Sequence, residues 1–136
     1  MKLKNLVHTT KMKDSGDNRG SSFTMPYESL SFIKNIRDIH LASITPGSVR
    51  GNHYHKNHRE LIIVVYSDAW ILYWDNGPKT GTQKLSFSGS GSILIEIEHL
   101  ASHAIVNEGN EDLYTIGLSD TPYDSENPDS HSRILV

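Results

Sequence analysis

Two histidines separated by one residue, His53 and His55, lie in a stretch that we expect to be a β-strand. Alternate residues of a strand point to the same face, with Cα atoms roughly 6.5–7 Å apart. Two imidazoles at this spacing can converge on one metal ion, with bonds of roughly 2.0–2.2 Å. A carboxylate, Glu60, follows after four polar residues and opens an apolar run over 61–65. We therefore expect a hairpin loop over 56–59, with Glu60 beside the histidines on a neighbouring strand.

A further nitrogen ligand, His103, is available much later in the chain. Three nitrogens and one carboxylate suit zinc, iron, manganese, nickel or copper, and they leave coordination positions open. The sequence thus predicts one divalent metal ion held by His53, His55, Glu60 and His103. The alternative is a polar hairpin in which the histidines occur by chance. His58, between the ligands, is expected to be a solvated loop residue rather than a fifth ligand.

The segments that position these residues are short apolar or alternating runs separated by turns. The expected strands cover 60–66, 69–74, 82–87, 93–97, 104–106 and 113–118, with an edge strand near 3–7, an extended segment after residue 22 and loose alternation over 32–44. Glycine, proline, asparagine or aspartate breaks the chain every eight to twelve residues, and no segment has a helical period. This pattern is typical of an all-β barrel or sandwich, here as one domain over residues 1–136. The tail from Asp120 is expected to be a loop.

Composition excludes several classes of function. The net charge of −3 gives no reason to expect nucleic acid or an anionic membrane as a partner. No apolar run approaches the roughly 20 residues of a membrane span, and the first residues lack a signal-peptide core, so a cytoplasmic location is the default expectation. The absence of cysteine excludes disulfides and thiol catalysis.

The metal-ligand pattern resembles the cupin family. Over 47–60 the chain has glycine, five residues, His-x-His, four residues and glutamate, as in the first cupin motif, although Ser67 replaces a later glycine. His103 and Asn107 match the end of the second motif, whose upstream Pro-x-Gly is replaced by residues 98–100. The resemblance implies a small cupin barrel, also described as a double-stranded β-helix or jelly roll.

Three further pieces narrow the resemblance. Thr45–His55, with its Arg-Gly-Asn-His-Tyr-His, is similar to the C-terminal metal-binding cupin domain of bifunctional capsular-polysaccharide enzymes that process UDP-sugars. The tail 123–130 is similar to that domain's closing segment, which ends in Asn-Pro-Asp-Thr. Asp17-Asn18-Arg19-Gly20 resembles a motif of dTDP-4-dehydrorhamnose epimerases and dTDP-sugar ketoisomerases. The family implies C3 epimerisation or ketoisomerisation of a nucleotide-linked 4-keto-6-deoxy sugar, in polysaccharide biosynthesis.

Two departures limit what the resemblance implies. The resemblance over residues 1–136 is to the cupin domain alone and does not extend to the reductase domain to which the capsular cupin is fused. The rhamnose epimerases have one histidine and no metal in their pocket and differ at His55 and Glu60, so their catalytic dyad does not carry over.

Substrate-binding candidates follow from residue type. An arginine beside a metal pocket offers a planar fork of donors for phosphate, so we expect Arg50, with Arg19, on the pyrophosphate of a UDP- or dTDP-sugar. The alternative for Arg50 is a surface salt bridge. Strand alternation puts Trp70, Leu72 and Trp74 on one face of their strand. We assign Trp74 to the ligand site, with core packing as the alternative.

The proton-transferring side chain is left open among His58, Tyr73 and Tyr123. The cofactor is expected to be zinc, with manganese, iron or nickel as alternatives. A short barrel exposes strand edges, so we expect a homodimer. Two other functions are consistent with the same residues: a non-catalytic cupin that binds a small ligand, and a metal-dependent oxygenase.

Overall fold

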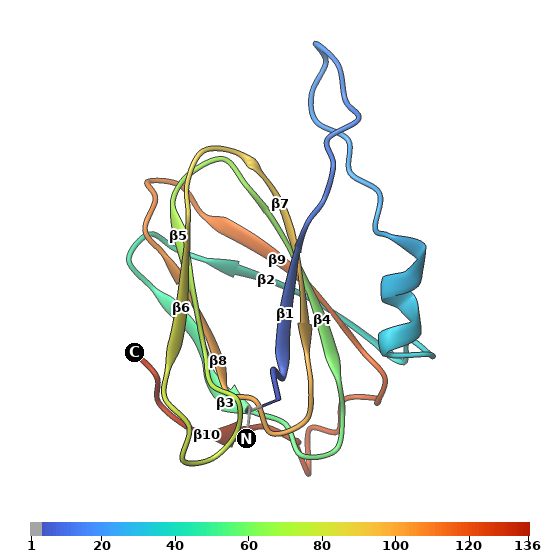
Figure 1. The fold of residues 1–136 in the computed structure, drawn as a ribbon, viewed down its shortest axis with the longest axis vertical. Coiled ribbons are helices and arrows are strands. Elements are labelled where there is room, and N and C mark those ends of the chain that lie inside the picture. The colour runs from blue at the N-terminus through green and yellow to red at the C-terminus, as the bar shows by residue number, and fades with distance from the viewer. Residues whose placement is uncertain (1–3) are drawn as a thin grey trace.

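A computed structural model describes residues 4–136, which form ten β-strands and one short 3-10 helix, η1 (Figure 1). The elements are β1 Val7–Lys11, η1 Tyr27–Phe32, β2 Asp38–Ile44, β3 Val49–Tyr54, β4 Glu60–Tyr66, β5 Trp70–Trp74, β6 Gln83–Phe87, β7 Gly91–Ile97, β8 His103–Asn107, β9 Leu113–Ser119 and β10 His131–Ser132. One sheet has the order β1-β7-β4-β9-β2, and the other has the order β10-β3-β8-β5-β6. Neighbouring strands in both sheets are antiparallel, so the expected all-β barrel is confirmed.

The main core lies between the two sheets and is built from strand alternation. On β5, Trp70 and Leu72 are fully buried, and Trp74 packs against the same cluster from the end of the strand. The Trp70 ring stacks on Phe87 of the neighbouring β6, with centroids 4.3 Å apart. Alternation along a pleated strand places the even-numbered residues of β5 on one face, as the sequence predicted, and this face is the one that packs into the core.

A second apolar cluster lies on the outer face of the first sheet. Residues 12–33 cross this face, and Met12 and Ile33 are buried there against Leu61, Leu94 and Leu118. Because no helix was expected in the chain, η1 corrects the prediction of an extended segment after residue 22. Pro26, with a φ of −56°, is the N-cap residue of η1. The helix is too short to show helical periodicity in the sequence.

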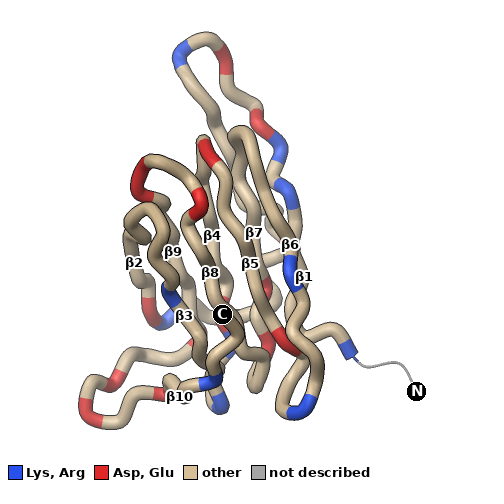
Figure 2. Tube along the Cα trace, turned by 90° about the vertical axis from the view of Figure 1, so that its left-hand side faces the viewer, with Lys and Arg blue, Asp and Glu red and all other residues tan. Residues whose placement is uncertain are grey.

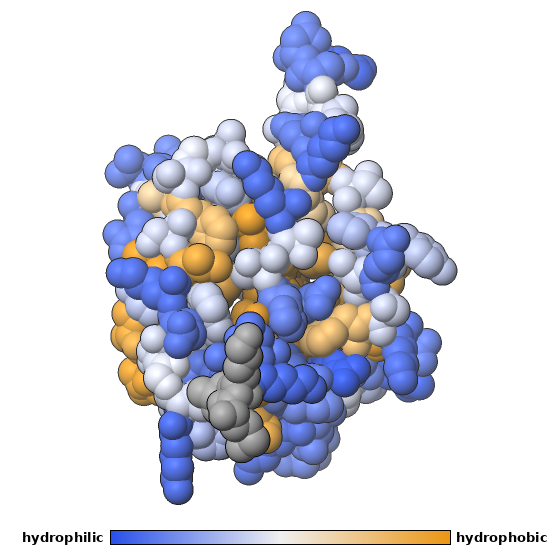
Figure 3. All heavy atoms as spheres, in the orientation of Figure 1, coloured by the Kyte–Doolittle hydropathy of each residue, from blue (hydrophilic) through white to orange (hydrophobic). Residues whose placement is uncertain are grey.

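The chain between Asp14 and Phe23 forms a projecting arm (Figure 1), closed by bridges from Asp14 to Phe23 and from Asp17 to Gly20. Figure 2 shows charges of both signs along the arm, and Figure 3 shows that its tip is hydrophilic. The arm lies at the opposite end of the barrel from β10 (Figure 1). Arg19, which is part of the arm, is therefore far from the end of the barrel where β10 lies.

The segment after β3 crosses between the sheets. β3 pairs with β8 and β10, whereas β4 pairs with β7 and β9. The predicted hairpin between the histidine strand and Glu60 is therefore wrong, because the two strands belong to opposite sheets. Glu60 approaches the histidines across the barrel mouth instead of along a ladder.

The tail also differs from the expected loop. β10 adds two residues to the edge of β3, pairing His131 with Tyr54 and Ser132 with His53. Beyond it, the Arg133 guanidinium binds the Asp75 carboxylate with two hydrogen bonds of 2.7 and 2.9 Å. Among residues 4–136, no helix has the length and apolarity needed to cross a membrane.

Close approach of β3 to β8 requires glycine at position 51. Gly51 has a φ of +108°, and a Cβ there would lie 2.5 Å from the carbonyl oxygen of His103. Next to it, Asn52 has a φ of +56°, and the register shifts by a bulge between Gly51 and His53. The bulge increases local twist and sets the side on which the histidines lie.

Gly51→Ala is therefore expected to lower the free energy of unfolding by more than about 2 kcal/mol, through backbone strain and overpacking. Gly81→Ala is the matched control, because a Cβ at Gly81 has no atom within 4 Å. Equilibrium urea unfolding measures both variants. Equal losses of stability in the two variants would contradict this account of the bulge.

Candidate metal centre

Three of the predicted ligands are brought together at one end of the barrel. His53 lies on β3 opposite His103 on β8, and His55 immediately follows β3. The ring centroid of His53 is 4.9 Å from that of His55 and 4.8 Å from that of His103, and the other pair is 5.5 Å apart. One ring nitrogen of each can lie within 4.8 Å of the others. Local spacing and strand register together create this cluster.

Glu60 reaches the same cluster from the opposite sheet. Its Oε2 lies 3.1 Å from Nε2 of His55, and both side chains are largely buried. Glu60 also forms a second, overlapping group of candidate ligands with His55 and His58. His55 belongs to both groups and so connects Glu60 with His53 and His103.

The hydrogen bond made by Nδ1 of His55 determines what its other nitrogen can do. Nδ1 lies 2.6 Å from the backbone carbonyl of Asp129. A carbonyl oxygen can only accept, so Nδ1 has the proton and a neutral ring presents a lone pair at Nε2. Nε2 is buried and has no hydrogen-bond partner of good geometry, while the Glu60 oxygen stands 3.1 Å away. Two acceptors at this distance repel each other unless a proton or a cation lies between them or beside them.

A divalent metal satisfies this arrangement. Two ligand atoms bound to one ion at about 2.1 Å, with angles of about 90–110°, lie about 3.0–3.4 Å apart. The observed 3.1 Å between His55 and Glu60 falls in this interval. The residues present therefore fit the metal that the sequence predicts.

The protonation states also favour metal binding. Burial lowers the pKa of His103 to about 3, and the neighbouring histidines act in the same direction. Burial likewise lowers the pKa of His53. Burial by itself raises the pKa of Glu60, but the neighbouring His55, His58 and His103 outweigh it and hold the pKa well below its usual value. Neutral imidazoles beside an ionised carboxylate are the forms in which these groups bind metals.

His58 is not the solvated loop residue that the sequence suggested. Its side chain is only 14% exposed, and its ring stacks on His55 with centroids 4.0 Å apart. Nδ1 lies 2.9 Å from a carboxylate oxygen of Asp129, and Nε2 lies 3.9 Å from Glu60. Burial lowers the pKa of His58, but the two carboxylates outweigh this effect and raise it. The prediction failed because Asp129 is distant in sequence and burial of the loop depends on it.

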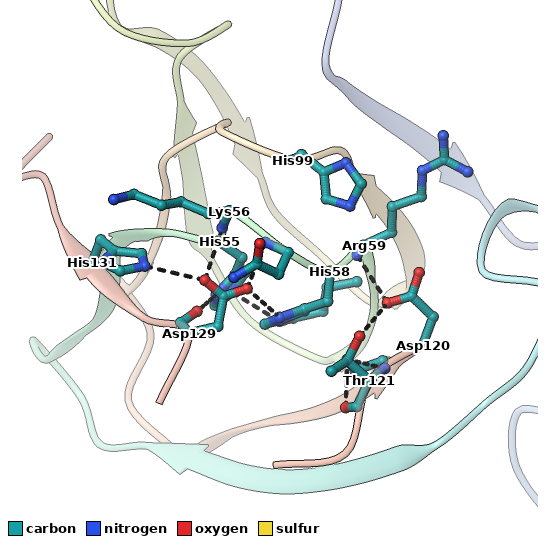
Figure 4. A network of polar contacts seen from close by, with 12 residues as sticks. His55, Lys56, His58, Arg59, His99, Asp120, Thr121, Asp129 and His131 are labelled. Carbon is teal, nitrogen blue, oxygen red and sulfur yellow. Dashed lines mark hydrogen bonds and ion pairs between the residues drawn. The ribbon is translucent and has the colours of Figure 1, made fainter. Parts of the chain in front are cut away.

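Asp129 is the important residue that the sequence did not single out. Its carboxylate accepts hydrogen bonds from the backbone N–H groups of Lys56 and Asn57, at 2.9 and 2.7 Å. Figure 4 shows it between His55, Lys56, His58 and His131. Burial raises the pKa of Asp129, but these backbone N–H groups lower it by more, so the carboxylate is ionised. The resemblance of the Asn-Pro-Asp tail to the closing segment of the capsular domain was the one sequence signal that could have pointed to Asp129.

The substrate-binding candidates lie at different distances from the cluster. Strand register pairs Arg50 with Ile105 and His53 with His103, so Arg50 is on the histidine-bearing face. Arg50 is exposed there and donates from Nε to the carbonyl of Ser43 at 2.7 Å. Trp74 pairs with His103 and lies beside it. Arg19 pairs with Asp17 at 2.6 Å in the arm.

The three proton-transfer candidates are also separated. Tyr73 lies on the face of β5 opposite to Trp74, next to Lys84 of β6. Tyr123 is 70% exposed in the segment between β9 and β10. Of the three, His58 is the one that the fold brings to the metal ligands.

A family model for the polysaccharide biosynthesis C-terminal domain matches residues 15–131. The chain belongs to this family. No curated protein sequence matches it. Among solved structures, the capsular polysaccharide assembling protein CapF from Staphylococcus aureus is 21% identical, with a TM-score of 0.63, over 91% of this chain and 34% of CapF. The chain thus spans about a third of that protein.

Two nucleotide-sugar enzymes share the fold. ChmJ, a 3′-monoepimerase from Streptomyces bikiniensis crystallised as a double mutant with dTDP, is 14% identical with a TM-score of 0.76, over 93% of this chain and 68% of that one. QdtA, a sugar 3,4-ketoisomerase from Thermoanaerobacterium thermosaccharolyticum crystallised with TDP, is 17% identical with a TM-score of 0.65, over 92% and 86%. The resemblance to the capsular cupin domain and the dTDP-sugar enzymes is confirmed.

Burial of His103 leads to a prediction about how the stability of the metal-free protein depends on pH in the acid range. Its pKa is about 3 when folded, against an ordinary value of 6.5. Between these values only the unfolded chain binds the proton, so stability is lost as pH falls below about 6.5, by at most about 1.4 kcal/mol per pH unit. His103→Gln should flatten this slope in urea unfolding between roughly pH 4 and pH 7. An unchanged slope would show that His103 is protonated in the folded state.

Proposed function

We propose that this domain is a metal-dependent enzyme that transfers protons on a nucleotide-linked keto-deoxy sugar, catalysing C3 epimerisation or ketoisomerisation. The observation that supports it most is the lone pair of His55, fixed by the Asp129 carbonyl and facing Glu60 at 3.1 Å among buried neutral histidines. The fold shared with a monoepimerase and a ketoisomerase supports the class of reaction. Membership of the polysaccharide biosynthesis family supports the pathway.

The proposed metal ligands are His53, His55, Glu60 and His103. When bound, a divalent ion supplies a Lewis acid that polarises a carbonyl oxygen. In this proposal the substrate binds at the end of the barrel that holds the histidines, on the face that bears Arg50. That arginine binds the pyrophosphate by charge-assisted hydrogen bonds.

The chain's own proton-transferring group in this proposal is His58. Asp129 holds its Nδ1, so its Nε2 is directed towards Glu60 and the metal cluster. A histidine placed in this way can take a proton from the carbon next to the ketone. In ketoisomerisation it can return the proton to the neighbouring carbon, whereas C3 epimerisation needs a second proton donor on the opposite face of the sugar. Trp74 pairs with His103 in the ladder between β5 and β8, and so borders the same site.

The purified protein is expected to contain about one divalent ion per chain. His103→Ala should weaken zinc binding as much as His53→Ala, because each removes one ligand, whereas His40→Ala should not, because this exposed histidine lies outside the cluster. Elemental analysis of protein never exposed to chelator or to a nickel column, with zinc calorimetry, tests this. Metal content near zero and no uptake of zinc, manganese or iron would refute the site.

The reaction is tested with UDP- and dTDP-linked 4-keto-6-deoxyhexoses in deuterated buffer. We expect deuterium to appear at the carbon next to the ketone, observed by NMR, only in the metal-loaded protein. Arg50→Lys should weaken nucleotide-sugar binding without changing metal content, because lysine cannot form the bidentate contact. Arg37→Lys is the control, since this exposed arginine directly precedes β2, the edge strand of the sheet that does not contain β3.

The outcomes separate the proposed enzyme from the other two functions. Binding of the sugar nucleotide without exchange would indicate a ligand-binding cupin. Oxygen consumption that depends on bound iron would indicate an oxygenase. Absence of both exchange and nucleotide binding would end the sugar-nucleotide proposal.

A further inference from the structure

The C-terminal segment (residues 129–136) pairs with the backbone of His53 through Ser132, and it reaches the ring of His55 through Asp129. The Asp129 carbonyl accepts from Nδ1 of His55 at 2.6 Å. Its carboxylate receives the backbone N–H groups of Lys56 and Asn57, Nδ1 of His58 at 2.9 Å and Nε2 of His131 at 3.1 Å. Five groups thus converge on Asp129, and four of them belong to the chain between His55 and Glu60 (Figure 4).

These contacts act on the ligand His55 in two ways. The carbonyl fixes the tautomer in which Nε2 has the lone pair, and it also fixes the rotation of the ring. The carboxylate fixes the backbone at 56 and 57, a crossing segment that is not part of any strand. Partners of this kind typically change metal affinity by about 10–100-fold when they are removed.

The remainder of the segment is also anchored by contacts that do not involve the histidine rings. Arg133 binds Asp75 through two hydrogen bonds, and its guanidinium lies over the Tyr54 ring at 4.3 Å. The side-chain oxygen of Asn52 accepts the backbone N–H of Leu135 at 2.9 Å. Asp129 is therefore delivered by a segment that is held against β3 at several points beyond the site.

We propose that Asp129 is a positioning residue for the metal centre, and that docking of the C-terminal segment completes the site by orienting His55 and the chain at 56–58. This inference deepens the proposed function, because it assumes that the histidine cluster binds a metal. By linkage, metal binding must stabilise docking of the segment by the same free energy that docking contributes to metal binding.

Asp129→Asn replaces one of the two acceptor oxygens of the side chain with an NH₂ group, and it keeps the backbone carbonyl and the shape of the side chain. Asp120→Asn is the matched control, because the Asp120 carboxylate accepts the N–H of Arg59 at the other end of the same crossing segment and contacts no histidine ring. Zinc calorimetry should show affinity about 10–100-fold weaker in Asp129→Asn. In Asp120→Asn, zinc affinity should change by less than about threefold.

Two measurements on the unmodified chain test the proposal without relying on a variant that folds. Nitrogen NMR of the zinc-free protein should show His55 protonated at Nδ1 and not at Nε2. Hydrogen exchange of the Arg133 and Leu135 amides, which bond to Asn52, should slow on addition of zinc. A purely structural role for Asp129 would leave both the tautomer and this zinc-dependent protection unexplained.

The results distinguish this inference from the proposed function. If the unmodified chain does not bind zinc, the proposed metal centre itself fails. If the unmodified chain binds zinc and Asp129→Asn binds it equally well, or zinc leaves the exchange of the two amides unchanged, the positioning role is overturned while the metal centre stands.

Discussion

The antiparallel pairing of β3 with β8 is the constraint on which the site depends. It places His53 opposite His103, although fifty residues of chain separate them, and the bulge at Gly51 and Asn52 sets the face on which both project. The same pairing leaves the far edge of β3 free to receive β10. The ligand cluster, the position of Arg50 and the docking of the tail are all consequences of one ladder.

Much of this could be predicted from the sequence, because the relevant signals are local. Alternation and turn residues located most strands within a few residues, and on β5 they also predicted which side chains share a face. The spacing of His53 and His55 predicted convergence because a strand repeats every two residues. His103 was found through its resemblance to a motif, since spacing within one strand cannot connect it to the others.

The parts that could not be predicted depend on contacts between distant residues. η1 is too short for periodicity to reveal, and its last residue, Phe32, packs with the following Ile33 on the outer face of the first sheet. The course of the chain from His55 to Glu60 depends on which sheet each strand joins. Burial of His58 depends on Asp129, which is 71 residues away.

The opposite origins of Glu60 and the histidines have a mechanical consequence. His53 and His103 belong to one sheet and Glu60 to the other, so a shared ion would act as a bridge across the barrel mouth. Such a bridge can form only after the two sheets have packed, late on the folding route. Interactions made after the transition state slow unfolding and leave the folding rate nearly unchanged. Loading with metal would therefore lengthen the lifetime of the closed barrel without helping it to assemble.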